Sequence, residues 1–384
     1  MLLWDSFIGG AQSLGVVGER TVVALARSGE TVLVRPWNLS LTLKRRWFLS
    51  EDAAKRAGYA WGDDALRLMH PEARELVLKG RGGISIDDEQ RSVALTWGPL
   101  DRLSDTYWRY SRLNVGYTFC DYTFVSPAER EACGRLDAVF VPSAFSRQAL
   151  VNSGVSVPVH VWPHGVWVDG DDPVQDTDSA QEDVITFLFA GVAQERKGIS
   201  ELLDAFTLAF PPEVKDVRLI VKSADWGRLE RWAALFPDGR ITWLHALFDR
   251  AQMNRLYRSV SCLVMPTRAE SFCLPLLEAM AAGVPVMYTD HGGHLDFCSP
   301  EVGYPIPVSR LAPALSAVDI RSRRFARPPE WAIPDVAALV ELMRDVYRNP
   351  EAARMKGRRG AQVAQAWTWE AGAERAIQLL RELA

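Results

Sequence analysis

The sequence predicts an α/β protein with two doubly wound domains that face a cleft. Three observations carry this prediction. The chain has 384 residues, which corresponds to two domains at about 150 residues per domain. Short apolar runs alternate with stretches of helical periodicity in both halves. The segment 169–183 is acidic, carries small residues and lacks large apolar ones, which is typical of an interdomain linker.

The composition is that of a globular protein, with 48% hydrophobic and 24% charged residues. A formal net charge of −4 disfavours a general affinity for nucleic acid. The five cysteines form no CxxC pair, so we expect neither a disulfide framework nor a structural zinc site, and a cytoplasmic location fits best. We expect no signal peptide and no transmembrane segment, while peripheral membrane contact stays open.

The first half opens with a strand–helix–strand unit. The apolar run 2–8 leads to Gly9 and Gly10, residues 16–28 have helical spacing, and 31–34 is the next strand. This unit predicts a parallel sheet, because such crossovers are right-handed. Further helices are expected near 51–57 and 71–78 and after the N-cap Ser143, and further strands at 91–96, 138–141 and 159–163.

The second half repeats this alternation more clearly. Strands are predicted at 185–190, 217–221, 241–244, 262–266 and 284–288, and helices at 199–210, 251–259, 275–282, 336–348 and 369–383. We therefore place one domain at 1–168 together with 367–384, the linker at 169–183, and the second domain at 184–366.

The segment 266–285 has the clearest chemical meaning. A buried strand ends at Pro266, the next turn carries Glu270, and a helix opens near Pro275. The free amides at the start of this helix favour an anion, and parallel sheets bind ligands at this edge. Because carboxylates repel phosphate, we expect Glu270 and Glu278 to bind hydroxyl groups beside the anion.

This segment resembles the Glu-x7-Glu signature of retaining, GT-B-type glycosyltransferases of the large group 1 family. Glu270 and Glu278 have the required spacing within ESFCLPLLEAMAAGVPV, which DHGG follows at 290–293. Residues 187–206, 138–145 with 161–166, and 367–370 are also similar to family segments. The resemblance implies the GT-B fold, with two Rossmann-like domains and a final helix that crosses back to the first.

The resemblance also implies a role for each matched residue. Glu278 would bind the ribose of a nucleotide, and Lys197 would neutralise the diphosphate leaving group, where charge develops in the transition state. Gly9 and Gly10 would let the backbone approach the donor. The donor sugar would be held by Glu270 and by the backbone amides of Ser271, Phe272, Cys273 and Leu274.

Some positions depart from the family pattern. Val192 stands where an arginine is usual, and Arg196 is the nearest substitute because its guanidinium grips phosphate. Cys273 stands where glycine is usual. Asp121 is the best candidate for the acidic residue near the donor sugar in the first domain, with a structural role as the alternative. His291 and His294 have HxxH spacing, but the glycines between them indicate a loop, so no metal or other cofactor is expected.

The implied activity is that of a retaining hexosyltransferase, which moves a sugar from a nucleotide-sugar donor to an unidentified acceptor. A nucleotide-sugar hydrolase or epimerase and a catalytically silent nucleotide-sugar-binding protein stay open as alternatives. The acceptor classes also stay open: a saccharide, a lipid-linked saccharide, a protein, a small metabolite or modified DNA. The first domain would be the acceptor side, and we interpret Trp37, Trp97, Trp108 and Tyr110 as candidates to line an acceptor groove.

Overall fold

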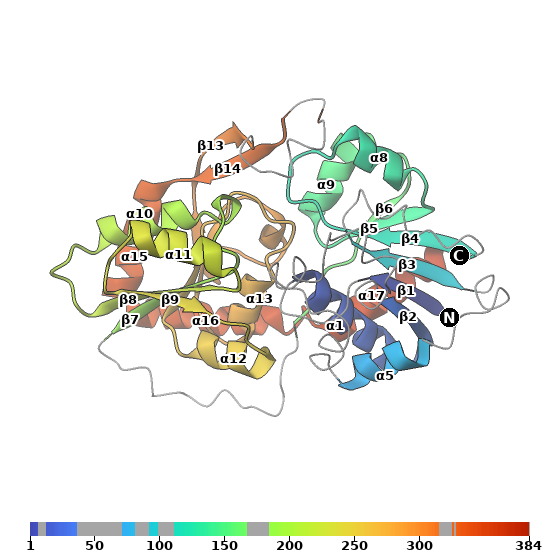
Figure 1. Cartoon of the computed structure of the whole chain (residues 1–384), viewed down its shortest axis with the longest axis horizontal. Coiled ribbons are helices and arrows are strands. Elements are labelled where there is room, and N and C mark those ends of the chain that lie inside the picture. The colour runs from blue at the N-terminus through green and yellow to red at the C-terminus, as the bar shows by residue number, and fades with distance from the viewer. Residues whose placement is uncertain are drawn as a thin grey trace. The chain divides into compact units, whose positions relative to one another are not determined.

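The computed structural model describes residues 1–6, 13–36, 71–80, 92–98, 111–166, 184–314, 325 and 328–383. They form two α/β units, each around its own six-stranded sheet (Figure 1). Unit 1 comprises Met1–Gly165, Val318–Arg327 and Trp369–Ala384, and unit 2 comprises Val166–Ala317 and Pro328–Thr368. The predicted fold class is confirmed. The predicted linker, Gly9 and Gly10 lie outside the described residues.

All six strands of the unit 1 sheet run parallel, in the order β2-β1-β3-β4-β5-β6. The strands are β1 (Leu2–Ser6), β2 (Val32–Pro36), β3 (Val93–Trp97), β4 (Leu113–Tyr117), β5 (Ala138–Val141) and β6 (Val159–Val161). The described helices are α1 (Ser13–Arg27), α5 (Pro71–Gly80), α8 (Pro127–Cys133), α9 (Ala144–Asn152) and α17 (Trp369–Leu383). Helix α1 packs against both α5 and α17. As predicted, Ser143 caps α9, where its hydroxyl accepts from the amide of Ser146 at 3.1 Å.

Strand β4 escaped the sequence analysis. Asn114 and Gly116 interrupt its apolar pattern, and both residue types are depleted in strands. The strand forms because β3 and β5 pair with it on either side. In addition, the Asp137 carboxylate accepts from the amide of Asn114 at 2.7 Å. Tertiary pairing therefore outweighs the local preference.

An aromatic cluster fills the core of unit 1. Tyr117 stacks on Trp162 with ring centroids 4.3 Å apart, and Trp97 lies 4.6 Å from Tyr117. The Tyr117 hydroxyl lies 2.6 Å from Nδ1 of His164, and burial lowers the pKa of that histidine to about 3. Trp97 is only 2% exposed, so its interpretation as an acceptor-groove residue is wrong. Trp37, Trp108 and Tyr110 lie outside the described residues.

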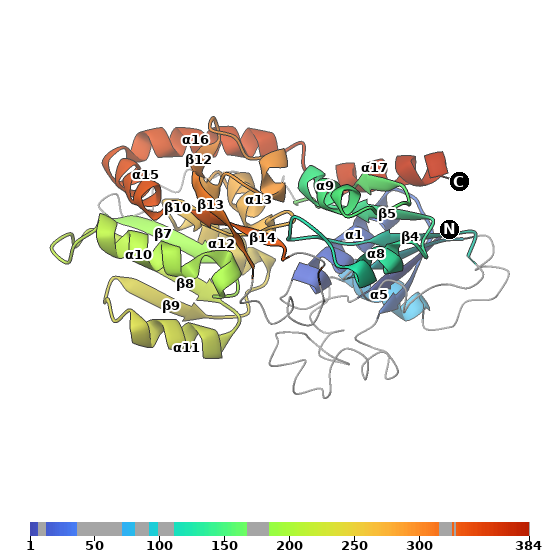
Figure 2. The ribbon, with the colours of Figure 1, turned by 90° about the horizontal axis from the view of Figure 1, so that it is seen from above.

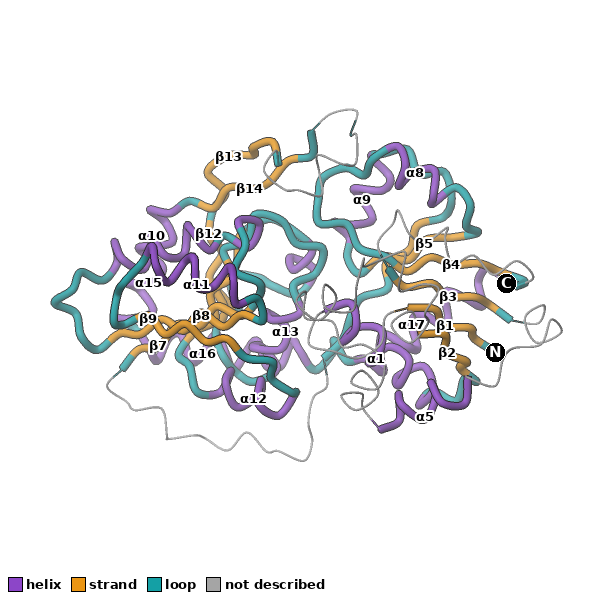
Figure 3. Tube along the Cα trace, viewed as in Figure 1, coloured by secondary structure: helices purple, strands orange, loops and turns teal. Residues whose placement is uncertain are grey.

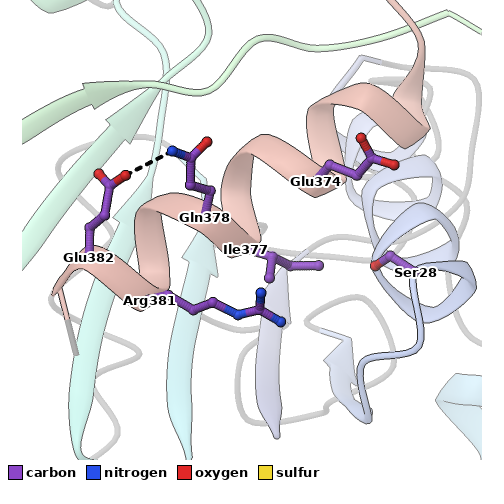
Figure 4. Close-up of a pocket in the computed structure, with 6 residues that line it drawn as sticks. All are labelled: Ser28, Glu374, Ile377, Gln378, Arg381 and Glu382. Atoms are coloured by element: carbon purple, nitrogen blue, oxygen red, sulfur yellow. Dashed lines mark hydrogen bonds between the residues drawn. The ribbon is translucent and has the colours of Figure 1, made fainter.

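A surface pocket of about 510 Å³ lies between the end of α1 and α17. Figure 4 shows Gln378 donating to Glu382 on α17, with Ser28 directly after the end of α1. The lining residues are Ser28, Glu374, Ile377, Gln378, Arg381 and Glu382. Because none of the predicted site residues is among them, this pocket is separate from the candidate site.

The unit 2 sheet is also parallel, in the order β12-β11-β10-β7-β8-β9. Its strands are β7 (Ile185–Ala190), β8 (Val217–Ser223), β9 (Ile241–His245), β10 (Cys262–Met265), β11 (Val286–Thr289) and β12 (Gly303–Ile306). The helices are α10 (Ile199–Ala209), α11 (Trp226–Leu235), α12 (Arg250–Arg258), α13 (Leu274–Ala281), α15 (Val336–Arg348) and α16 (Pro350–Ala364). Helices α10 and α11 lie on one side of β7–β9, and α12 and α16 lie on the other (Figures 1 and 3).

Besides α11 and β12, two further features of unit 2 were not predicted. One is the antiparallel hairpin of β13 (Val308–Pro313) and β14 (Glu330–Pro334), visible beside β12 in Figure 2. The other is α16, whose helix propensity is lowered by Gly357 and Gly360. A Cβ at Gly357 would lie 2.2 Å from the carbonyl oxygen of Gly283, so glycine is needed for α16 to pack this closely. Among the described helices, none is both long and apolar enough to cross a bilayer.

Candidate active site

The predicted site residues of unit 2 lie in two loops at the carboxyl edge of its sheet. One loop follows β7 and contains the short helix η3 (Glu195–Lys197) and the turn at Gly198 that opens α10. The other follows β10, runs from Pro266 to Cys273 and opens α13. Strands β7 and β10 are neighbours in the sheet, although their order in the chain is interrupted by β8 and β9. Such a switch point is where open α/β sheets bind ligands.

The two loops are joined by Lys197 and Glu270. The ammonium group of Lys197 donates to Oε1 of Glu270, a residue that is 4% exposed. The guanidinium of Arg196 lies 3.7 Å from Oε2 of the same carboxylate and donates to the carbonyl of Ala269 at 2.6 Å. Both oxygens of Glu270 therefore face a cation. Arg196 brings its charge here although Val192 occupies the position where an arginine is usual.

Gly198 allows the two loops to approach each other. Its φ of +70° lies in the left-handed region, and a Cβ at this position would lie 1.8 Å from the carbonyl oxygen of Pro266. Any other residue would have to displace the backbone at Pro266, so glycine is required both for the conformation and for the approach.

Helix α13 begins at Cys273, which has an unusual backbone. With φ at 68°, it is the single non-glycine residue with positive φ among those described. This conformation costs roughly 1–2 kcal/mol. No side chain caps α13, and Pro275 stands in its first turn. The first amides of α13 thus have no side-chain acceptor at the cap, and they form the type of helix terminus that attracts anions.

Glu278 lies on α13, one turn beyond its start. Its carboxylate accepts a hydrogen bond from the hydroxyl of Tyr257 on α12 at 3.0 Å. Burial lowers the pKa of Lys222, at the end of β8, while the nearby Glu278 carboxylate opposes that shift. The hydrogen bond from Tyr257 therefore fixes the orientation of the Glu278 carboxylate.

Three buried polar atoms in the loops after β10 and β11 have no hydrogen-bond partner among the described residues. They are Oγ1 of Thr267, Oγ1 of Thr289 and Nδ1 of His294. Nε2 of His294 lies 2.7 Å from the carbonyl of Thr289, and burial lowers the pKa of this histidine. The ring is therefore neutral with its proton on Nε2, which leaves Nδ1 as an acceptor.

Comparison with known proteins adds to this geometry. Residues 174–317 match the family model described as glycosyl transferases group 1. This segment is therefore similar to group 1 glycosyltransferases. Over 150 residues the chain is 32% identical to a sucrose synthase of Acidithiobacillus caldus. This match covers 38% of this chain and 16% of that protein. Over 203 residues the chain is 27% identical to a D-inositol 3-phosphate glycosyltransferase of Streptomyces coelicolor. This match covers 50% of this chain and 39% of that protein. The chain thus matches well under half the length of these relatives.

Solved structures show which fold the chain has. Sucrose-phosphate synthase from Thermosynechococcus elongatus superposes with a TM-score of 0.67 at 18% identity, covering 100% of this chain and 98% of that chain. Anabaena HepE in complex with UDP-glucose superposes with a TM-score of 0.65 at 14% identity, covering 99% of each chain. The GT-B fold and the group 1 resemblance predicted from the sequence are confirmed.

The structure places the predicted residues of the candidate site as follows. Arg196, Lys197 and Glu270 lie together, and Glu278 lies on the helix that the Glu270 loop opens. Asp121 belongs to unit 1, in the connection between β4 and α8. His291 is in a loop, as predicted, whereas His294 lies in the short 3-10 helix η4 (Gly293–Asp296). No group of three candidate metal ligands occurs in the described part of the chain.

Sequence reasoning missed several residues around this site. Tyr257 and Lys222 carry no motif, because they come from a helix and a strand outside the segments 187–206 and 266–285, which resemble the family. Arg268 was missed for another reason: it lies within the predicted loop, two residues before Glu270, but a lone arginine there has no recognisable pattern. Its position between a buried strand and Glu270 was the available signal.

Proposed function

We propose that the chain is a retaining glycosyltransferase that transfers a hexosyl group from a nucleoside-diphosphate sugar to an acceptor hydroxyl group. The observation that carries the proposal is the meeting of Lys197, Arg196 and Glu270 beside the first turn of α13. Cations and the amides at the start of a helix bind a diphosphate, and a carboxylate beside them binds sugar hydroxyl groups. This combination fits a substrate that has both groups.

The diphosphate is assigned to the positive side of this cluster. When the bond between the anomeric carbon and the phosphate oxygen breaks, the electron pair stays on the diphosphate. Lys197, Arg196 and the amides of α13 stabilise this charge, a contribution that exceeds their effect on the bound ground state. The proposal includes no metal or other cofactor, since protein cations supply the neutralisation, and we expect activity to persist in EDTA.

The sugar and the ribose are assigned to the two carboxylates. Glu270 accepts hydrogen bonds from sugar hydroxyls, with the backbone amides of Ser271, Phe272, Cys273 and Leu274 around it. Glu278 accepts from the ribose hydroxyls, and the hydroxyl of Tyr257 holds its carboxylate in place. Asp121 of unit 1 is assigned to the donor sugar. HepE was solved with UDP-glucose, so UDP-glucose is the first donor to test.

Retention follows if the acceptor attacks from the face that the diphosphate leaves. The acceptor oxygen forms the new bond to the anomeric carbon, and its proton passes to an oxygen of the departing diphosphate. The new bond and the broken bond then lie on the same side of the sugar, so the anomeric configuration is kept.

The experiment that tests the proposal is an assay with UDP-, GDP- and ADP-glucose against a panel of acceptors, with the product anomer determined by NMR. We expect a retained product. An inverted product would overturn retention, free sugar or an epimer from donor alone would indicate a hydrolase or epimerase, and donor binding without turnover would indicate a silent binding protein. Glu278→Ala should abolish donor binding. Glu230→Ala, on the exposed surface of α11, is the matched control.

A further inference from the structure

The loop that carries Glu270 also carries Arg268. The guanidinium of Arg268 connects the Glu270 loop to the loop after β7. Nε of Arg268 donates to Oε1 of Glu201 on α10 at 2.7 Å, and Nη1 donates to Oε1 of Glu195 at 2.7 Å. One side chain thus binds two carboxylates from the loop and helix that carry Arg196 and Lys197.

The backbone and ring contacts of Arg268 hold it in this position. Its amide donates to the carbonyl of Arg196 at 2.8 Å, and its carbonyl accepts from the amide of Ala332 on β14 at 2.9 Å. The guanidinium lies 5.6 Å from the ring of the buried Trp331. With only 14% of its side chain exposed, Arg268 is fixed from three directions.

The partners of Arg268 explain why such a residue is needed. Glu195 directly precedes Arg196 and Lys197, and Glu201 lies one turn into α10 with 6% exposure. Two carboxylates this close to a diphosphate site repel the ligand and compete with it for the two cations. Arg268 engages both carboxylates, which leaves Lys197 and Arg196 directed at Glu270.

We propose that Arg268 is a positioning residue of the donor site: it holds Glu195 and Glu201 so that Lys197 and Arg196 remain available to the donor diphosphate. The inference rests on the proposed function. Arg268 itself touches no donor atom in this scheme. Lysine is a poor replacement, because a single ammonium group lacks the planar fork that binds two carboxylates and lies over the Trp331 ring.

The test is nucleotide affinity, measured by calorimetry with UDP, GDP and ADP as probes. We expect Arg268→Gln to lower affinity for the preferred nucleotide about tenfold. Adding Glu195→Gln to that variant should restore most of the loss, because the freed carboxylate is removed. In a Lys197→Ala background, Arg268→Gln should have a smaller effect than in the wild type, since only its influence through Arg196 remains. A purely structural role predicts neither the restoration nor this non-additivity.

Arg344→Gln is the matched control. The Arg344 guanidinium donates to the carbonyls of Leu208 and Ala209 at 3.0 and 3.3 Å, and so binds the far end of α10. This variant should lose stability but keep nucleotide affinity. Arg268→Lys, which keeps the charge, replaces Arg268→Gln if the latter does not fold, with an intermediate loss expected.

The outcomes separate the two proposals. If the wild type binds none of the nucleotides, or if Lys197→Ala binds as tightly as wild type, the donor site itself is wrong and this inference falls with it. If Lys197→Ala weakens binding but Arg268→Gln does not, only the positioning role is overturned. The positioning role is also overturned if Glu195→Gln restores none of the affinity that Arg268→Gln removes.

Discussion

The ammonium group of Lys197 donates to the carboxylate of Glu270 across the junction of β7 and β10, so two loops separated by more than seventy residues of chain share one ion pair. Each partner lies in a loop at the carboxyl end of a parallel strand. The pair thereby sets where a diphosphate and a sugar would meet in unit 2.

Replacing Lys197 removes the cation nearest to the leaving group. We expect Lys197→Ala to lower kcat about 10²–10³-fold, as the loss of one preorganised charge does elsewhere. Steady-state kinetics with the preferred donor measures this. Lys215→Ala removes an exposed lysine and should leave kcat unchanged. Equal kcat values for the two variants would contradict the role of Lys197.

Gly198→Ala should destabilise unit 2 strongly for two reasons. The added Cβ would collide with the carbonyl of Pro266, and the alanine would have to adopt a left-handed backbone conformation. We expect a loss of at least about 2 kcal/mol in the free energy of unfolding. Gly283→Ala is the control, since its φ of +77° is similar but no atom lies within 4 Å of the added Cβ. Urea denaturation of both variants separates the effect of the collision from that of the backbone conformation. Equal losses in the free energy of unfolding would refute the collision.

At position 273, the usual order of stability of alanine and glycine variants should be reversed. Its φ of 68° strains any side chain, whereas glycine adopts it freely. Cys273→Gly should therefore be more stable than Cys273→Ala by about 1 kcal/mol. At Cys262, a buried residue of β10, alanine should instead be more stable than glycine by about 0.5–1 kcal/mol. Finding the same order at both sites would argue against backbone strain at Cys273.

His164 should make stability depend on pH. Burial lowers its pKa from 6.5 to about 3, so the unfolded chain binds a proton that the folded chain does not between these values. Above pH 6.5, the neutral His164 makes its full contribution to the free energy of unfolding. As the pH falls below 6.5, this contribution decreases by about 1.4 kcal/mol per pH unit. Compared with wild type, His164→Gln should flatten this dependence in denaturation curves at pH 4–7. His245→Gln changes an exposed histidine and should leave the slope as it is.

Much of the fold could be predicted because it is encoded locally. Apolar runs and helical spacing located the strands around Ile185–Ala190 and Cys262–Met265, and Ser143 marked a helix start. Two of the elements that were missed depend on distant partners. Strand β4 is completed by its neighbours, and α16 tolerates glycine because that residue packs against Gly283.

The sequence by itself indicated the resemblance to group 1 glycosyltransferases, the two-domain α/β fold and the candidate donor residues, because these follow from residue types at fixed spacing. Tertiary structure alone decided that Arg196 reaches Glu270, that Arg268 engages Glu195 and Glu201, and that Trp97 is buried in an aromatic core. The physical reason is that hydrogen bonds and burial depend on distances between segments far apart in the chain. A local pattern does not contain those distances.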